Sequence, residues 1–210
     1  MKHLFKNLMV AALLLAGGTT LGAAELGKEY KLLNPPQPVS GKKIEVLEFF
    51  FYGCSHCFDL QKSLHPWLKT MPKDVELIYV PVVFTDRDAR EPMARTLYAL
   101  EIMGQDQKLH DKLYLAFNVE GADLTDEAKI SDFVAKNGVD RAKFSAAYNS
   151  FTINSKVARI KQMVRSYGIQ GTPTLVVDGK YIITGLYPED AIRVLNEVIA
   201  MARKERAGKK

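Results

Sequence analysis

The feature that most restricts the fold is a buried strand that leads directly into a helix, with the only two cysteines of the chain at the junction. Residues 44–52, IEVLEFFFY, are a short apolar and aromatic run that ends at Gly53, as expected for a strand covered on both faces. Beyond Cys54, apolar residues recur at helical spacing up to Met71. The sequence therefore predicts a strand, a turn, and a helix that begins at the C-x-x-C pair.

The rest of the chain predicts an α/β protein with one long helical block. A second strand is expected over 75–84, and residues 88–152 follow a helical pattern throughout. We expect Thr125 and Asp140 to cap two helices of this block. A helix after Asn154, a hairpin with Asp178-Gly179 as its two-residue turn, and a helix from near Pro188 complete the order.

The N-terminal 24 residues predict a secretory signal peptide. Lys2 and Lys6 precede the apolar stretch LMVAALLLAGG, and small residues follow before Ala24 and Glu25, where cleavage is expected. The apolar stretch is shorter than the roughly 20 residues that span a membrane. Export would place the protein where disulfides persist. Residues 25–43, rich in Pro and Gly, are expected to form an extended lead-in.

Charge gives little reason to expect a nucleic-acid partner. The formal net charge is +5, but two of the 29 basic residues belong to the predicted signal. Much of the remaining excess lies in the C-terminal tail ARKERAGKK, which is typical of a solvated terminus. Elsewhere the basic and acidic residues alternate without forming a patch in sequence.

The C-x-x-C pair allows three interpretations: half of a zinc site, a structural disulfide, or a redox pair. A structural zinc site needs four ligands, and neither a second C-x-x-C nor a paired histidine spacing is present. A structural disulfide across so small a loop would add little stability. The redox interpretation fits best, because a helix N-terminus stabilises a thiolate at Cys54 and places Cys57 one turn inward. His56, between them, can bring a cation or donor near the Cys54 sulfur.

Two segments resemble the DsbA family of bacterial periplasmic thiol-disulfide oxidoreductases: VLEFFFYGCSHC and, more than a hundred residues later, GIQGTPTLVVDGKY. The resemblance runs over essentially the whole mature chain. It implies a thioredoxin fold with an inserted helical domain, in which 44–87 and 153–210 form the thioredoxin domain and 88–152 the insertion. It also implies that Pro173 is a cis-proline facing the cysteines, and that Thr172 and Pro173 present backbone groups to an extended substrate.

The sequence departs from the family pattern at two places. Ser55-His56 stands between the cysteines where the family usually has Pro-His; Ser55 contributes a backbone N–H and a hydroxyl beside the substrate site. Glu48 matches a buried acid of the family, but Tyr79 falls where several members have a lysine partner. Two alternatives remain for Glu48: a buried carboxyl with a raised pKa that exchanges a proton with Cys57, or a strand-end carboxylate in water.

The expected function is donation of the Cys54–Cys57 disulfide to reduced, unfolded exported proteins in the periplasm. By resemblance, a DsbB-like quinone-linked inner-membrane oxidase regenerates the disulfide, and neither a bound cofactor nor a metal is needed. A monomer is expected. Two alternatives stay open: an isomerase or reductase on the same fold, and a thioredoxin-fold chaperone for metals or haem proteins.

Overall fold

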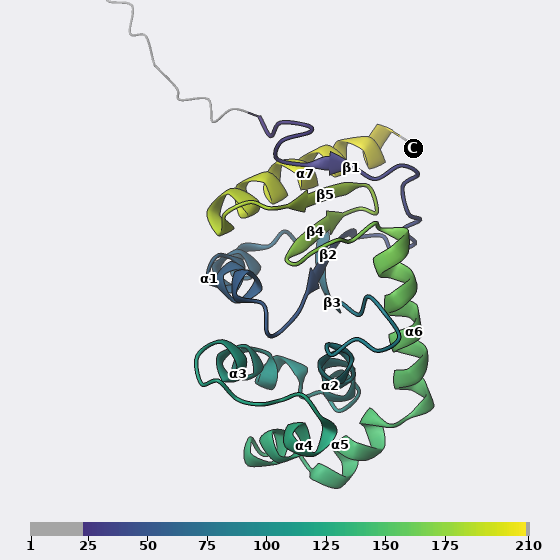
Figure 1. The fold of residues 1–210 in the computed structure, drawn as a ribbon. Coiled ribbons are helices and arrows are strands. Elements are labelled where there is room, and N and C mark those ends of the chain that lie inside the picture. Colours follow the sequence, from purple (N-terminus) through teal and green to yellow (C-terminus); the bar gives the residue numbers. More distant parts are fainter. Residues whose placement is uncertain (1–22, 209–210) are drawn as a thin grey trace, which may run out of the picture.

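The computed structural model describes residues 23–208, so the predicted signal peptide lies, except for its last two residues, outside the described residues. A five-stranded sheet forms the centre of the molecule, with the strand order β1-β5-β4-β2-β3 (Figure 1). Strand β2 pairs in parallel with β3 and antiparallel with β4. The strands are β1 (Lys31–Leu32), β2 (Ile44–Phe50), β3 (Val75–Pro81), β4 (Thr174–Val177) and β5 (Tyr181–Thr184).

Helices cover both faces of the sheet. Side chains of α1 and α7 share one buried cluster with Val46 of β2, and side chains of α2 and α6 share another with Leu47 of β2. Because successive strand residues point to opposite faces, β2 must be apolar at nearly every position. The helices are α1 (Ser55–Thr70), α2 (Glu91–Ile102), α3 (Asp106–Asn118), α4 (Glu127–Lys136), α5 (Arg141–Tyr148), α6 (Phe151–Ser166) and α7 (Pro188–Gly208).

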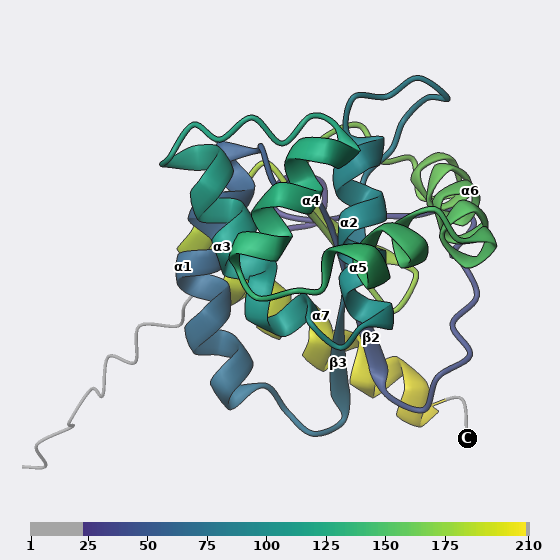
Figure 2. The same ribbon diagram turned by 90° about the horizontal axis from the view of Figure 1, so that it is seen from below.

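Helices α2 to α5 gather at one end of the sheet, and α6 runs from this block back along the sheet (Figure 1). The block has its own apolar core, and Phe50, Tyr52 and Cys57 are part of it. The end of β2 and the start of α1 therefore pack directly against the helical block. Seen from below, α3 lies next to α1 (Figure 2).

Several element boundaries differ from the sequence-based expectation. The expected strands 44–52 and 75–84 end earlier, at Phe50 and Pro81. Asp140 caps α5 as predicted, but the N-cap of α4 is Asp126, because the Thr125 hydroxyl donates instead to Asp123 at 2.6 Å.

The helix expected after Asn154 starts earlier, and the hairpin turn is longer than expected. Ser150 caps α6, which begins at Phe151. Asp178 and Gly179 both have positive φ, but Val177 pairs with Tyr181, so the loop holds three residues and not two. Within residues 23–208, none of the helices combines the length and apolarity needed to cross a membrane.

The hairpin supports the N-terminal lead-in at Gly179. Its φ is +64°, and a Cβ there would lie 2.2 Å from the backbone oxygen of Gln37. The Gln37 N–H donates to the Gly179 carbonyl at 2.8 Å, so the two backbones are held together. Only glycine fits both the backbone conformation and the close contact.

We predict that Gly179→Ala destabilises the protein far more than Gly168→Ala does. Gly168 has nearly the same φ, +62°, but no neighbouring atom within 4 Å of an added Cβ. Its replacement should cost about 1 to 2 kcal/mol from backbone strain alone. Gly179→Ala should cost at least twice as much, because the lead-in must also move. Urea unfolding of both variants measures this, and equal losses would show that the lead-in does not pack on the hairpin.

Candidate active site

Cys54 is the N-cap of α1, and its sulfur is placed to accept hydrogen bonds from the first turn of the helix. The chain leaves β2 through a turn closed by the Cys54 N–H and the Phe51 carbonyl, 3.0 Å apart. The Cys57 N–H donates to the Cys54 Sγ at 3.4 Å, and the Cys54 Sγ also lies 3.5 Å from the Thr172 carbonyl oxygen. Unpaired N–H groups at a helix start favour negative charge at this position.

The two thiols have opposite acidities. The pKa of Cys54 is lowered to about 5, chiefly by the hydrogen bond from the Cys57 thiol, with the Thr172 side chain and the N–H groups of Cys57 and His56 adding to it against partial burial. Burial raises the pKa of Cys57, and its thiol is further held protonated because it donates to Cys54. Cys54 is half-buried and Cys57 is fully buried. Cys54 is thus suited to act as the thiolate and Cys57 to stay protonated.

The loop before β4 faces the cysteine pair across the site. The Thr172-Pro173 peptide bond is cis, as the resemblance implied. Thr172 brings both its carbonyl and its side chain to Cys54. Ser55 is exposed at the first position of α1, directly after Cys54, and Pro173 follows the Thr172 that contacts the Cys54 sulfur.

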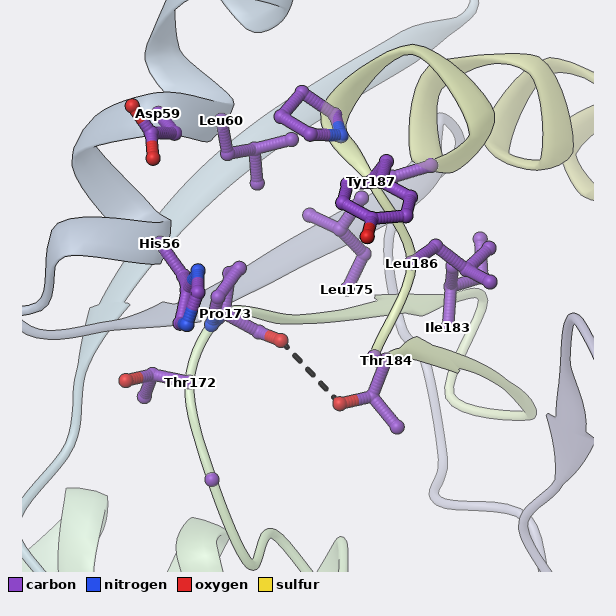
Figure 3. A pocket seen from close by; sticks show the side chains of 14 residues that line it. His56, Asp59, Leu60, Thr172, Pro173, Leu175, Ile183, Thr184, Leu186 and Tyr187 are labelled. Atoms are coloured by element: carbon purple, nitrogen blue, oxygen red, sulfur yellow. Dashed lines mark hydrogen bonds between the residues drawn. The ribbon is translucent and has the colours of Figure 1, made fainter.

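A groove of about 520 Å³ begins at this loop and runs to the start of α7. His56, Pro173 and Tyr187 all line it (Figure 3). Its walls are mostly apolar and come from α1, β4, β5, the loop before α7 and the first turn of α7; they include Leu60, Leu175, Ile183, Leu186 and Ala191. Sequence reasoning missed these residues, although the apolar pair Leu186-Tyr187 in a predicted loop was a usable signal.

Glu48 lies beneath the pair, in the apolar strand β2. It is fully buried, and Tyr79 on β3 is opposite it in register. The Gln61 amide donates to its Oε1 at 3.1 Å, while Oε2 has no hydrogen-bond partner among residues 23–208. Burial raises the pKa of Glu48 to about 8, against the opposing effect of the Gln61 hydrogen bond, and the charge of Cys54 adds to the rise. The alternative of a strand-end carboxylate in water is therefore wrong, because α1 covers this position.

A histidine that sequence reasoning considered only as a possible zinc ligand lies in this interior. His110, on α3, is buried, and its Nδ1 is 2.9 Å from the Tyr52 hydroxyl. Burial lowers its pKa to about 3, so the ring is neutral at physiological pH. In the part of the chain that the structure describes, no group of three or more His, Cys, Asp or Glu residues could hold a metal ion.

A low-pKa cysteine at a helix start, a buried partner cysteine and a cis-proline loop facing them define a thiol-disulfide oxidoreductase of the thioredoxin class. Comparison with known proteins gives the family. Residues 45–195 match the family model described as the DSBA-like thioredoxin domain. The chain belongs to the DsbA family, and its fold is accordingly the thioredoxin fold with an inserted helical domain.

The similarity extends over nearly the full length. The thiol:disulfide interchange protein DsbA of Pseudomonas syringae pv. tomato is 35% identical over 216 residues, which cover 98% of each chain. That of Burkholderia cepacia is 35% identical over 86% of each chain. The crystal structure of Pseudomonas aeruginosa DsbA superimposes with a TM-score of 0.80 at 34% identity, over 89% of this chain and 97% of that one.

We predict that Glu48 makes the oxidised protein less stable as the pH rises. The Cys54 charge that adds to the pKa of about 8 is absent from the oxidised protein, but burial, the largest cause, remains, so over a range above its unfolded pKa near 4.5 the carboxyl binds a proton only in the folded state. Its contribution to stability is complete below pH 4.5 and is lost as the pH rises towards 8, by about 1.4 kcal/mol per pH unit. Glu48→Gln keeps the size and the neutral state, and should remove this loss.

Urea unfolding of the oxidised forms from pH 5 to pH 8 measures the effect. The oxidised state is required because the Cys54 thiolate of the reduced protein contributes in the opposite direction. Parallel curves for the wild type and Glu48→Gln would contradict a raised pKa at Glu48.

Proposed function

We propose that this protein donates its Cys54–Cys57 disulfide to newly exported, reduced proteins. The observation that supports this direction is the contrast between the two thiols: Cys54 is the better leaving group, with a pKa lowered to about 5, and Cys57 is buried. A dithiol whose reduced form is stabilised by a thiolate gives up its disulfide readily.

The exchange has two steps. A substrate thiolate attacks the Cys54 Sγ, the bond between the two enzyme sulfurs breaks, and Cys57 leaves and takes up a proton. A second substrate thiolate then attacks the substrate sulfur of the mixed disulfide and releases Cys54 as a thiolate. Two electrons pass from the substrate to the enzyme pair, and the substrate gains one disulfide.

Glu48 is proposed as the proton donor to Cys57. Its pKa of about 8 means that it carries a proton at neutral pH, and it lies close enough for the Cys54 charge to raise that pKa. The same carboxyl would take the proton back when the pair is reoxidised. A group exchanges protons most efficiently when its pKa is near the working pH.

The groove and the cis-proline loop are proposed to hold the substrate. Thr172 and Pro173 offer backbone groups to an extended substrate segment, which would bind by main-chain hydrogen bonds as a neighbouring strand does in a sheet. The apolar groove suits an unfolded chain, which exposes side chains that a folded protein buries. Ser55 and His56 stand at the entrance, and we propose that the His56 imidazole contributes a donor or positive charge near the Cys54 sulfur during exchange.

The cellular setting follows from the same proposal. Residues 1–24 direct export to the periplasm, 25–43 form the lead-in, and 88–152 are the insertion between the two parts of the thioredoxin domain, 44–87 and 153–210. A DsbB-like quinone-linked membrane oxidase regenerates the disulfide, and the redox-active pair works as a monomer without a bound cofactor. Membership of the DsbA family supports the export, the periplasmic location and the membrane oxidase.

The proposal predicts a trapped intermediate on one cysteine only. Oxidised wild-type protein mixed with a reduced, unfolded disulfide protein should transfer close to one disulfide per molecule. In Cys57→Ser activated as a mixed disulfide at Cys54, attack of a substrate thiolate on the Cys54 sulfur should expel the activating thiol and leave a mixed disulfide between Cys54 and the substrate, whereas Cys54→Ser should be inert. Non-reducing electrophoresis and mass spectrometry of alkylated samples distinguish these species. A Cys54→Ser variant as active as the wild type would contradict the proposed roles.

A further inference from the structure

Three residues at four-residue spacing on α3 all contact Tyr52, two positions before Cys54. His110, Tyr114 and Asn118 lie on one stripe of the helix, because residues four apart share a face. The His110 Nδ1 is 2.9 Å from the Tyr52 hydroxyl, and the Tyr114 ring packs edge-on against the Tyr52 ring at 5.0 Å between centroids. Asn118, the last residue of α3, donates from Nδ2 to the Tyr52 carbonyl at 2.7 Å.

Tyr52 is thus held at both ends. Its ring is fully buried, and its hydroxyl and backbone carbonyl bond to residues two turns apart on the same helix. The Asn118 amide also donates to the Tyr114 carbonyl at 2.9 Å, which fixes the Asn118 side chain on the helix end. Both hydrogens of that amide are therefore used.

The bond to the Tyr52 carbonyl matters because Tyr52 and Gly53 are the central residues of the turn that leads into Cys54. That turn is closed between the Phe51 carbonyl and the Cys54 N–H. The carbonyl of a turn's second residue has no partner within the turn. Gly53 has a φ outside the left-handed region here, which excludes a type II turn. A glycine at position 53 is compatible with either orientation of the Tyr52–Gly53 peptide. The turn sequence alone therefore does not select the orientation that the structure shows.

We propose that His110, Tyr114 and Asn118 form a clamp on Tyr52, and that Asn118 is a positioning residue that fixes the Tyr52-Gly53 peptide and thereby the start of the C-x-x-C turn. The clamp rests on the proposed redox function of Cys54. Through it, the helical insertion controls the reactivity of a cysteine that belongs to the thioredoxin domain.

The consequence for the chemistry follows from the distances at Cys54. The Cys54 sulfur accepts from the Cys57 N–H at 3.4 Å. A hydrogen bond weakens as its length grows and its angle closes, so a shift of the turn weakens this one. Weaker bonds stabilise the thiolate less, and the reduced pair becomes less favoured relative to the disulfide. Loss of the clamp should therefore make the pair a weaker oxidant.

Asn118→Ala tests the clamp, with Asn137→Ala as a matched control. Asn137 is also half-buried at a helix end, and its Nδ2 donates to the carbonyl four residues earlier, Phe133, at 3.0 Å, but it does not contact the redox turn. Three quantities are compared: the midpoint of the Cys54 thiolate absorbance against pH, the equilibrium constant with glutathione, and the urea midpoint. Both variants should lose some stability from the lost helix-end bond.

Only Asn118→Ala should change the redox chemistry. We expect its thiolate midpoint to rise by at least half a pH unit and its equilibrium constant with glutathione to shift at least threefold towards the disulfide form. Asn118→Gln, which keeps an amide donor, should recover part of both shifts. If Asn118→Ala does not fold, Asn118→Leu keeps the volume without a donor and should show the same shifts.

Redox values for the Asn118 variants that equal those of Asn137→Ala would overturn the clamp. The wild-type values test the proposed function separately. A wild type without a low thiolate midpoint would refute the proposed function, whereas a normal wild type with unchanged Asn118 variants would refute only the clamp.

Discussion

The whole site depends on the hydrogen bonds that the first turn of α1 makes to the Cys54 sulfur. The Cys57 thiol and N–H and the N–H of His56 all act on Cys54 because Cys54 is the N-cap of this helix. Three residues later, the same helical turn places Cys57 in the apolar interior. One local geometry therefore makes one thiol acidic and keeps its partner protonated, which is the difference that disulfide donation needs.

The rest of the fold holds this geometry in place. Strand β2 is buried on both faces and leads into the turn before Cys54. Thr172 of the cis-proline loop contacts the Cys54 sulfur, and Asn118 of α3, in the helical block, contacts the turn. Glu48 is an exception in this apolar strand: a carboxyl there costs stability unless it is protonated. The proposed proton exchange with Cys57, and not stability, gives this carboxyl its place in the account.

Much of this arrangement could be predicted from the sequence, since it depends on local patterns. The strand-to-helix junction and the inward position of Cys57 follow from periodicity along single elements. The position of Tyr79 opposite Glu48 was indicated by the family pattern, and the register of β2 and β3 agrees with it. The family resemblance added the cis form of Pro173 and the inserted helical domain, which no local pattern supplies.

The features that sequence reasoning missed depend on contacts between distant segments. The groove combines α1 with the loop before α7, and the burial of His110 depends on α3 packing against the end of β2. The N-cap of α4 was misassigned by one residue because a competing hydrogen bond from Thr125 to Asp123 was invisible in sequence. His110, Tyr114 and Asn118 lie four residues apart, but only the structure shows that they share Tyr52.

The most direct measurement is the difference in unfolding free energy between the reduced and the oxidised protein as a function of pH. A thiolate with a folded pKa of about 5 stabilises the reduced form fully above its unfolded pKa of about 8.5 and loses this as the pH falls through 5. The reduced form should gain on the order of 2 kcal/mol over the oxidised form between pH 5 and pH 8, allowing for solvent screening of a half-exposed sulfur. It should also unfold at the higher denaturant concentration at pH 7. A difference that does not change with pH, or an oxidised form that stays the more stable at pH 8, would contradict a reduced state held by the Cys54 thiolate.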